Sequence, residues 1–176
     1  MRLTAIILIA LAVMFLCMLP ILGINYFVWL DSLRETFACV SFSLAETLGA
    51  SGMTLNGTVI TLSNGEKVNI AHSCIDFTTT ALVAVAATLV ITLVLVLKGY
   101  APTKLGILIM LILTFIVGTA VNIVRIGVTL YLANSYYTSL VQSAGWQTFH
   151  DSVALFIYTL YIAFCAFLAY VYAAKP

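Results

Sequence analysis

The sequence predicts an all-α polytopic membrane protein with about four transmembrane helices. Of its 176 residues, 64% are hydrophobic and only 7% are charged, whereas soluble domains carry about 25% charged residues. Several apolar runs exceed the roughly 18 residues that indicate a spanning helix. The formal net charge of +1 provides no basic surface for nucleic acid. We therefore expect one small membrane domain over residues 1–176, with the lipid bilayer and not nucleic acid as its surroundings.

Four apolar segments define the predicted spans. The first covers roughly residues 3–30, and we interpret it as an uncleaved span because no small-residue cleavage site stands out. The other three cover roughly residues 77–97, 105–130 and 152–172.

The distribution of basic residues predicts the orientation of these spans. Four basic residues fall on one side of the four-span arrangement: Arg2, Lys98, Lys104 and Lys175. The positive-inside rule makes this side cytoplasmic. We therefore expect a multi-pass plasma membrane protein whose two termini are cytoplasmic.

Two segments outside the spans have patterns of their own. Residues 31–49 repeat apolar side chains at helical spacing, but charges interrupt them, so we expect an amphipathic helix on the membrane surface. Residues 54–71 predict an extracytoplasmic β-hairpin around Asn64-Gly65, a dipeptide that favours two-residue turns. That turn would place Val59 opposite Ile70 and, by the same register, Thr61 opposite Val68.

Three chemically distinctive residues are predicted at one depth. Cys74 precedes Lys98 by 24 positions, Arg125 follows Lys104 by 21, and His150 precedes Lys175 by 25. At ~1.5 Å per helical residue these separations are about 31 to 37 Å, close to the thickness of the hydrocarbon core. All three side chains are therefore expected at the outer ends of spans two, three and four, where a small bundle can bring them together.

These residue types suit acyl transfer. A cysteine is nucleophilic as its thiolate, which a nearby cation favours. Arg125 stays protonated and can stabilise a thiolate or an oxyanion, and His150 can transfer a proton near neutral pH. No C-x-x-C pair is present, and we expect neither a metal nor a cofactor.

The sequence resembles the exosortase and archaeosortase family of membrane cysteine transpeptidases. The resemblance rests on four features: the hairpin leading from Val68 to Cys74, the segment Asn122-Ile-Val-Arg125-Ile, His150 at the head of the last span, and the order of the spans. By this resemblance Cys74 is the nucleophile, Arg125 the cation and His150 the proton-transfer residue, with Asn122 one turn from Arg125 in a supporting role.

The resemblance also implies a function in protein sorting. Family members recognise membrane-anchored proteins that end in a short motif, a hydrophobic helix and a basic tail. They cleave at the motif, as a protease does, and transfer the new carboxyl end to a cell-envelope acceptor that is expected to be lipid-linked. We therefore expect the active site to be extracytoplasmic.

One departure from the family pattern concerns the residues after the cysteine. The family usually has a small hydroxyl residue and then glycine, where this chain has Ile75 and Asp76. A carboxylate two residues from the thiol disfavours a thiolate unless a cation pairs with it. Asp76 is therefore a candidate supporting residue and a feature that bears on activity.

Each candidate residue also has a structural interpretation. Cys74 can be a structural thiol, Arg125 a side chain that snorkels to the interface, and His150 a helix cap. His72 is a rival base, since it lies close to Cys74 in sequence, although His150 is preferred. Asp151 either orients His150 or stabilises the helix N-terminus electrostatically, and we favour the latter.

The alternative class of function is a non-enzymatic membrane assembly or accessory subunit. Polar residues at span ends would then join the helices through hydrogen bonds. A transporter is a weaker third hypothesis, because no ionisable residue is predicted near mid-bilayer.

Overall fold

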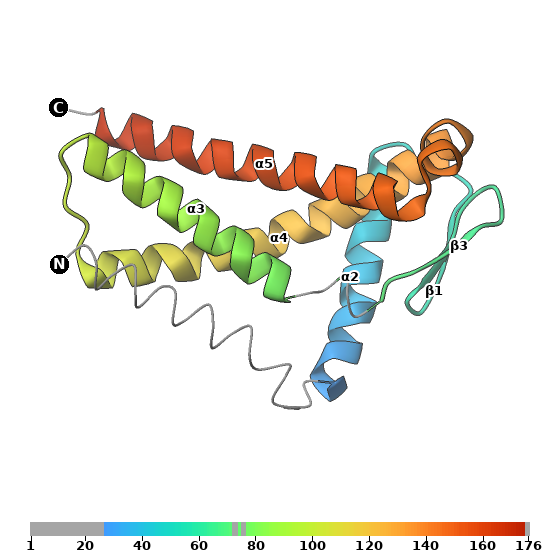
Figure 1. The fold of residues 1–176 in the computed structure, drawn as a ribbon. Coiled ribbons are helices and arrows are strands. Elements are labelled where there is room, and N and C mark those ends of the chain that lie inside the picture. The colour runs from blue at the N-terminus through green and yellow to red at the C-terminus, as the bar shows by residue number, and fades with distance from the viewer. Residues whose placement is uncertain (1–26, 72–73, 75–76, 175–176) are drawn as a thin grey trace. The chain divides into compact units, whose positions relative to one another are not determined.

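The computed structural model describes residues 27–71, 74 and 77–174 of the chain (Figure 1). Within these residues three helices are long and apolar enough to cross a membrane. They are α3 (Phe77–Leu97), α4 (Lys104–Tyr136) and α5 (Trp146–Ala173). A small three-stranded sheet accompanies them. The predicted class, a helical polytopic membrane protein, is confirmed, and the predicted first span lies outside the described residues except for its last four positions.

The described helices differ from the predicted spans mainly at the end of α4 and at the start of α5. Helix α3 has the predicted bounds of 77–97. Helix α4 continues six residues beyond the predicted end at 130 and runs on into the π-helix η2 (Tyr137–Gln142). Helix α5 starts at Trp146, after Gly145 with φ +80°, and not at residue 152. Hydropathy marks the apolar part of a helix, and here both helices extend beyond that part.

The described chain forms two compact units, and the first is a bundle of three helical segments. It contains α3, α4 as far as Ala120 and α5 from Tyr158. Thr114 joins the three segments, because its hydroxyl lies 2.9 Å from that of Thr88 on α3 and its carbonyl accepts a hydrogen bond from Tyr161 on α5. Such bonds hold helices together in lipid, where apolar association is weak.

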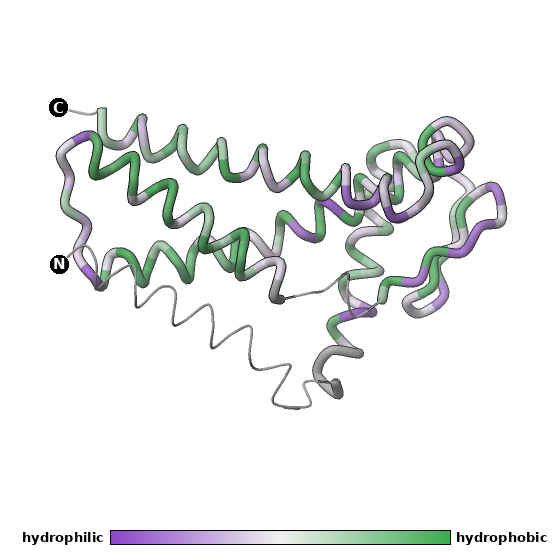
Figure 2. Tube along the Cα trace, in the orientation of Figure 1, coloured by the Kyte–Doolittle hydropathy of each residue, from purple (hydrophilic) through white to green (hydrophobic). Residues whose placement is uncertain are grey.

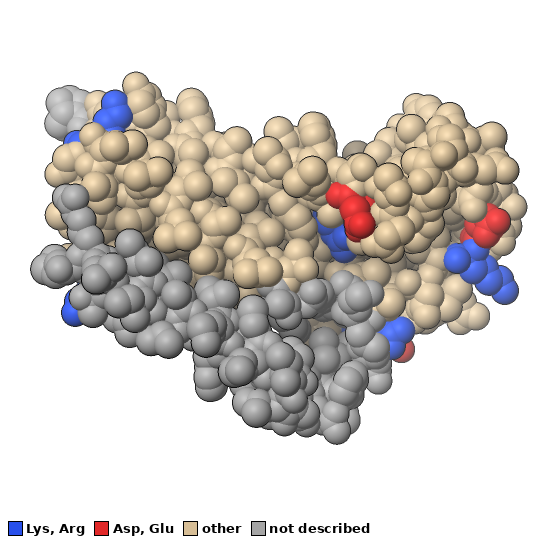
Figure 3. Space-filling model, in the orientation of Figure 1, with Lys and Arg blue, Asp and Glu red and all other residues tan. Residues whose placement is uncertain are grey.

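Much of the surface of this unit is apolar, as in proteins that contact lipid. Figure 2 shows apolar residues along most of α3 and the first part of α4, and most of the face drawn in Figure 3 is formed by uncharged residues. At one end, Lys98 Nζ lies 4.1 Å from the centroid of the Tyr170 ring, and the rings of Tyr100 and Tyr172 are 6.4 Å apart. Aromatic and basic side chains together are typical of a membrane–water interface.

The second unit packs the helix α2 (Phe27–Thr47) against the later part of α4 and the sheet. Its buried face is formed by Phe37, Ala38, Ser41 and Ala45. Among the apolar positions of residues 31–49, Phe37 is buried, whereas Val40 is 45% exposed. Small residues on this face let α2 approach α4 closely.

The sheet has three antiparallel strands in the order β1 (Thr54–Asn56), β2 (Val59–Thr61) and β3 (Lys67–Asn69). The hairpin between β2 and β3 was predicted, and β1 was not recognised as a separate strand. Gly57, with φ +58°, provides the tight turn that joins β1 to β2. The inner face of the sheet buries Ile60, Leu62 and Ile70 in the core that it shares with α2 and α4.

The predicted hairpin register is wrong by one residue. Val59 lies opposite Asn69 and not opposite Ile70, and Thr61 lies opposite Lys67. Because side chains alternate along a strand, a shift of one position exchanges the two faces. The observed register is the one that turns the apolar members of β2 and β3 toward the core.

The turn chemistry explains this shift. Leu62 N–H donates to the carbonyl of Glu66, so the connection has three residues, Ser63 to Gly65. Of these only Gly65 has a positive φ, at +88°. A two-residue type I′ turn needs positive φ at both central positions, whereas a three-residue loop needs it only at the last. Asn64-Gly65 is compatible with either turn.

We predict that Gly127→Ala destabilises the second unit. An added Cβ at Gly127 would lie 2.7 Å from Leu44 Cδ2 and 3.1 Å from its Cβ, so α2 would have to shift. Such overpacking costs about 1–3 kcal/mol, more than the helix propensity that alanine adds. The melting temperature of the purified protein in detergent should fall.

The matched control is Gly118→Ala in the same helix. There an added Cβ meets Thr80 Cγ2 at 3.5 Å, an ordinary contact. This variant should melt at or above the wild-type temperature. Equal melting temperatures for the two variants would contradict close packing of α2 on α4.

Candidate active site

Cys74, which follows the sheet in the chain, is held by its backbone. Its N–H donates to the carbonyl of Ala71 at 2.9 Å. Its carbonyl accepts two hydrogen bonds from α4, from Asn122 Nδ2 at 2.9 Å and from Arg125 Nη2 at 3.3 Å. These bonds fix the position of a half-buried cysteine against a helix 48 residues further along the chain.

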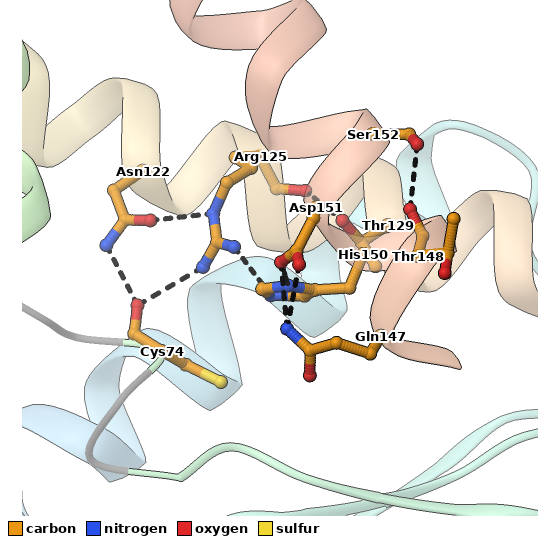
Figure 4. Close-up of polar contacts among 9 residues, drawn as sticks. All are labelled: Cys74, Asn122, Arg125, Thr129, Gln147, Thr148, His150, Asp151 and Ser152. Atoms are coloured by element: carbon orange, nitrogen blue, oxygen red, sulfur yellow. Dashed lines mark hydrogen bonds and ion pairs between the residues drawn. The ribbon is translucent and has the colours of Figure 1, made fainter. Parts of the chain in front are cut away.

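Arg125 is the centre of this arrangement. Its side chain is 4% exposed, and its three nitrogens bind three different groups (Figure 4). Besides the Cys74 carbonyl, these are the Asn122 side-chain oxygen, at 2.9 Å from Nε, and His150 Nε2, at 2.6 Å from Nη1. Within the described part of the chain, these three partners are all uncharged acceptors. The guanidinium is therefore a buried cation whose charge no direct partner among them balances.

The contact with Arg125 determines which nitrogen of His150 carries the proton. A guanidinium can only donate, so Nε2 of His150 must accept and must be unprotonated. The neutral ring then carries its proton on Nδ1, which lies 3.1 Å from Asp151 Oδ1 and donates to it. The structure thus contains His150 as the less common tautomer of neutral imidazole.

Asp151 contributes to the orientation of His150. It lies beyond the first turn of α5, which contains no acidic residue, so the favoured interpretation of a helix N-terminal charge does not describe it. Gln147 Nε2 donates to both carboxylate oxygens of Asp151, at 3.0 and 2.9 Å. A continuous series of hydrogen bonds therefore runs from Gln147 through Asp151 and His150 to Arg125.

The thiol of Cys74 faces a different direction from its carbonyl. In Figure 4 the carbonyl points toward Arg125 and Asn122, while the sulfur points away from them. Among the described residues, no hydrogen bond joins the sulfur to Arg125 or His150. Cys74 and His150 both border a pocket of about 610 Å³. The other lining residues come from the β3 region, α4, η2 and α5: Glu66, Lys67, Val68, Asn69, Ile70, Ala71, Ile126, Thr129, Leu130, Tyr137, Trp146 and Gln147.

Comparison with known protein families identifies the relationship that this geometry suggests. A family model described as transmembrane exosortase matches residues 1–168. The chain belongs to the transmembrane exosortase family. No curated protein and no solved structure matches it. At the level of the family, membership makes the chain a membrane-embedded sorting transpeptidase of the cysteine type.

In this exosortase the structure brings together four of the five residues singled out from the sequence. Cys74, Asn122, Arg125 and His150 form one hydrogen-bonded group. Asp76, the fifth, lies outside the described residues, as does the rival base His72.

Two contributors to the exosortase site were missed in the sequence. Gln147 lies four residues before Asp151, a helical spacing that could have indicated their contact. Arg34 of α2 donates from Nε to the carbonyl of Ile70 at 3.0 Å and supports the chain that leads to Cys74. Nothing local in the sequence indicates this second contact, because it joins positions 36 residues apart.

We predict that His150 of the exosortase is a neutral ring protonated on Nδ1. The chain has two histidines, so a His72→Asn variant leaves His150 as the only ring to observe. Its nitrogen-15 shifts above neutral pH should show a lone pair on Nε2. In the double variant Arg125→Met and Asp151→Ala, which lacks both the donor to Nε2 and the acceptor from Nδ1, the proton should move to Nε2, the usual position. A ring that is already protonated on Nε2 in His72→Asn alone would contradict the Arg125–His150 hydrogen bond.

Proposed function

We propose that this exosortase-family protein cleaves C-terminal sorting signals of envelope proteins at the outer face of the membrane and transfers the new carboxyl end to an acceptor. Cys74 is the nucleophile, Arg125 the stabilising cation and His150 the proton-transfer residue, with Asn122 positioning both Arg125 and Cys74. The substrate is a membrane-anchored protein with a C-terminal hydrophobic helix and a basic tail, and the acceptor is lipid-linked.

The observation that carries this proposal is the buried Arg125 with uncharged partners beside a cysteine. Taking a cation out of water without a counter-charge is costly. The same arrangement strongly favours a negative charge that appears nearby during a reaction, because the stabilising group is already in place. A thiolate and a tetrahedral oxyanion are both such charges. A structural cation would be expected to have a carboxylate as a direct partner, whereas Arg125 contacts an amide, a carbonyl and an imidazole and reaches the Asp151 carboxylate only through His150.

The first half of the reaction forms a thioester. Cys74 sulfur attacks the carbonyl carbon of the scissile peptide, its proton passes to Nε2 of His150, and the carbonyl oxygen becomes an oxyanion. Nε2 can accept that proton only after its hydrogen bond from Arg125 Nη1 has been broken. The oxyanion gives the guanidinium a stronger acceptor, so charge development and release of His150 occur together. The C–N bond then breaks, and His150 returns the proton to the leaving amine.

The second half releases the product. An acceptor nucleophile attacks the thioester carbonyl, His150 takes the proton of the nucleophile, and the Cys74 thiolate leaves and is reprotonated. Water in place of the acceptor gives simple hydrolysis. Asp151 stays ionised and keeps the imidazole oriented in both halves, while Gln147 holds Asp151 in place.

The basic residues support an extracytoplasmic location of the site. Lys98 and Lys104 flank the loop between α3 and α4, and Lys98 lies against Tyr170 near the end of α5. These residues mark the cytoplasmic end of the helical unit. Arg125 is 21 residues beyond Lys104 in one continuous helix, about 31 Å, which reaches the opposite interface.

We predict that Cys74→Ala abolishes processing of sorting signals in the native host. Without the nucleophile, the rate should fall roughly a thousand-fold or more. Mass spectrometry of envelope proteins would then find intact C-terminal helices and basic tails that are absent in the wild type. Cys39→Ala, which removes an exposed thiol on α2, is the matched control and should process normally. Normal processing by Cys74→Ala would favour the accessory-subunit interpretation.

We also predict that Cys74 is labelled from outside the cell. In a background that lacks the other three cysteines, a membrane-impermeant maleimide should modify it in intact cells. The control is Ala101→Cys in a chain that lacks Cys74. Position 101 lies in the exposed loop between α3 and α4, and it should be modified only after permeabilisation. The reverse pattern would invert the proposed topology and place the reaction in the cytoplasm.

A further inference from the structure

The strand β3 is an edge strand with free backbone groups. It is the last member of the sheet, and among the described residues it pairs with β2 alone. The bonds from Leu62 N–H to Glu66 and from Ile70 N–H to Thr58 show that even-numbered residues direct their backbone groups toward β2. Because these directions alternate in an antiparallel pair, the N–H and C=O groups of Lys67 and Asn69 point away from the sheet.

The pocket beside Cys74 follows this free edge. Its lining includes every residue from Glu66 to Ala71, although successive side chains of a strand point to opposite faces. A cavity on one face of the sheet would be lined by alternate residues only. The pocket therefore runs along the edge itself, and it continues to Cys74 at one end and to Trp146 and His150 on its far wall.

An edge strand presents unpaired N–H and C=O groups that can pair with another chain. Here the free edge lies against a pocket of about 610 Å³, inside the range of roughly 300–1,000 Å³ that holds ligands of the size of a short peptide. Beyond β3, both Ala71 and Cys74 line this pocket. An extended peptide that pairs with Lys67 and Asn69 would therefore have its end close to the thiol.

We propose that the substrate segment next to the scissile bond binds as a fourth strand along β3. This inference rests on the proposed function and names how the substrate is held. The backbone groups of Lys67 and Asn69 recognise the main chain of the peptide, which gives affinity that tolerates many sequences. Alternate side chains of the peptide point into the pocket, where Tyr137 and Trp146 provide apolar surface.

The experiment measures how fast Cys74 is alkylated in the purified full-length protein that lacks the other cysteines. The probes are a short acetylated peptide of alternating alanine and threonine with a C-terminal chloromethyl ketone, and iodoacetamide. In each case the sulfur bonds to the methylene carbon, the halide leaves, and the thiol proton goes to solvent. Iodoacetamide cannot pair with a strand, so the ratio of the two rates isolates peptide binding from thiol reactivity.

Methylation of peptide nitrogens tests strand pairing directly. Two further probes carry N-methyl groups on one or the other alternate set of residues. Only the set facing β3 donates to the edge, so one probe should lose roughly ten-fold in relative rate for each hydrogen bond removed, and the other should change by less than about two-fold. Equal loss with both probes, or no loss with either, would overturn strand addition.

Proline substitutions test the same edge from the side of the protein. Lys67→Pro removes an outward N–H without removing a bond to β2, so the relative rate should fall roughly ten-fold. Lys67→Ala keeps the N–H, so the ten-fold fall is measured for Lys67→Pro relative to Lys67→Ala. Asn69→Pro and Asn69→Ala form a second pair if Lys67→Pro alters the iodoacetamide rate. Proline variants that behave like their alanine partners would overturn the proposal.

The proposed strand addition and the proposed function are contradicted by different results. Rapid alkylation by iodoacetamide with no dependence on methylation or on proline would remove strand addition and leave the cysteine mechanism intact. If Cys74 reacts with iodoacetamide no faster than Cys39 in a Cys74→Ala chain, and forms no peptide adduct, then the proposed function fails and the inference fails with it.

Discussion

The buried guanidinium of Arg125 organises the whole second unit of the molecule. Its hydrogen bonds join α4 to the segment that carries Cys74 and to the start of α5. A cation at 4% exposure is tolerated only where several acceptors converge on it. The positions of the cysteine, the asparagine and the histidine are therefore consequences of satisfying one side chain, and the same requirement leaves the charge available for chemistry.

Much of this arrangement could be predicted from the sequence, because a membrane restricts a chain strongly. Apolar runs must become helices, helical rise converts residue number into depth, and basic residues mark one end. These constraints predicted α3 residue for residue, and they predicted that Cys74, Arg125 and His150 have a common depth. The family relationship followed from Asn122, Arg125 and their order relative to Cys74 and His150.

The remaining features depend on interactions that sequence patterns do not determine. Asn64-Gly65 permits two turns, and the choice between them is made by the burial of Ile60 and Ile70 against α2. The proton on Nδ1 of His150 follows from a donor 25 residues away. The contact of Arg34 with the Ile70 carbonyl joins two elements that have no shared periodicity. In each case, a contact between segments far apart in the sequence selects one of several local arrangements of similar energy.

The loop of Ser63, Asn64 and Gly65 has a consequence for how such a protein can diverge. Its length determines which backbone groups of β3 face the pocket and which face β2. Insertion or deletion of one residue in this loop would exchange the two sets of backbone groups and leave the sequence of the strand unchanged. Substitutions of the exposed Lys67 and Asn69 leave these backbone directions unchanged, whereas an insertion or deletion in the loop alters them. The length of this loop is therefore under stronger constraint than the identity of the exposed residues of β3.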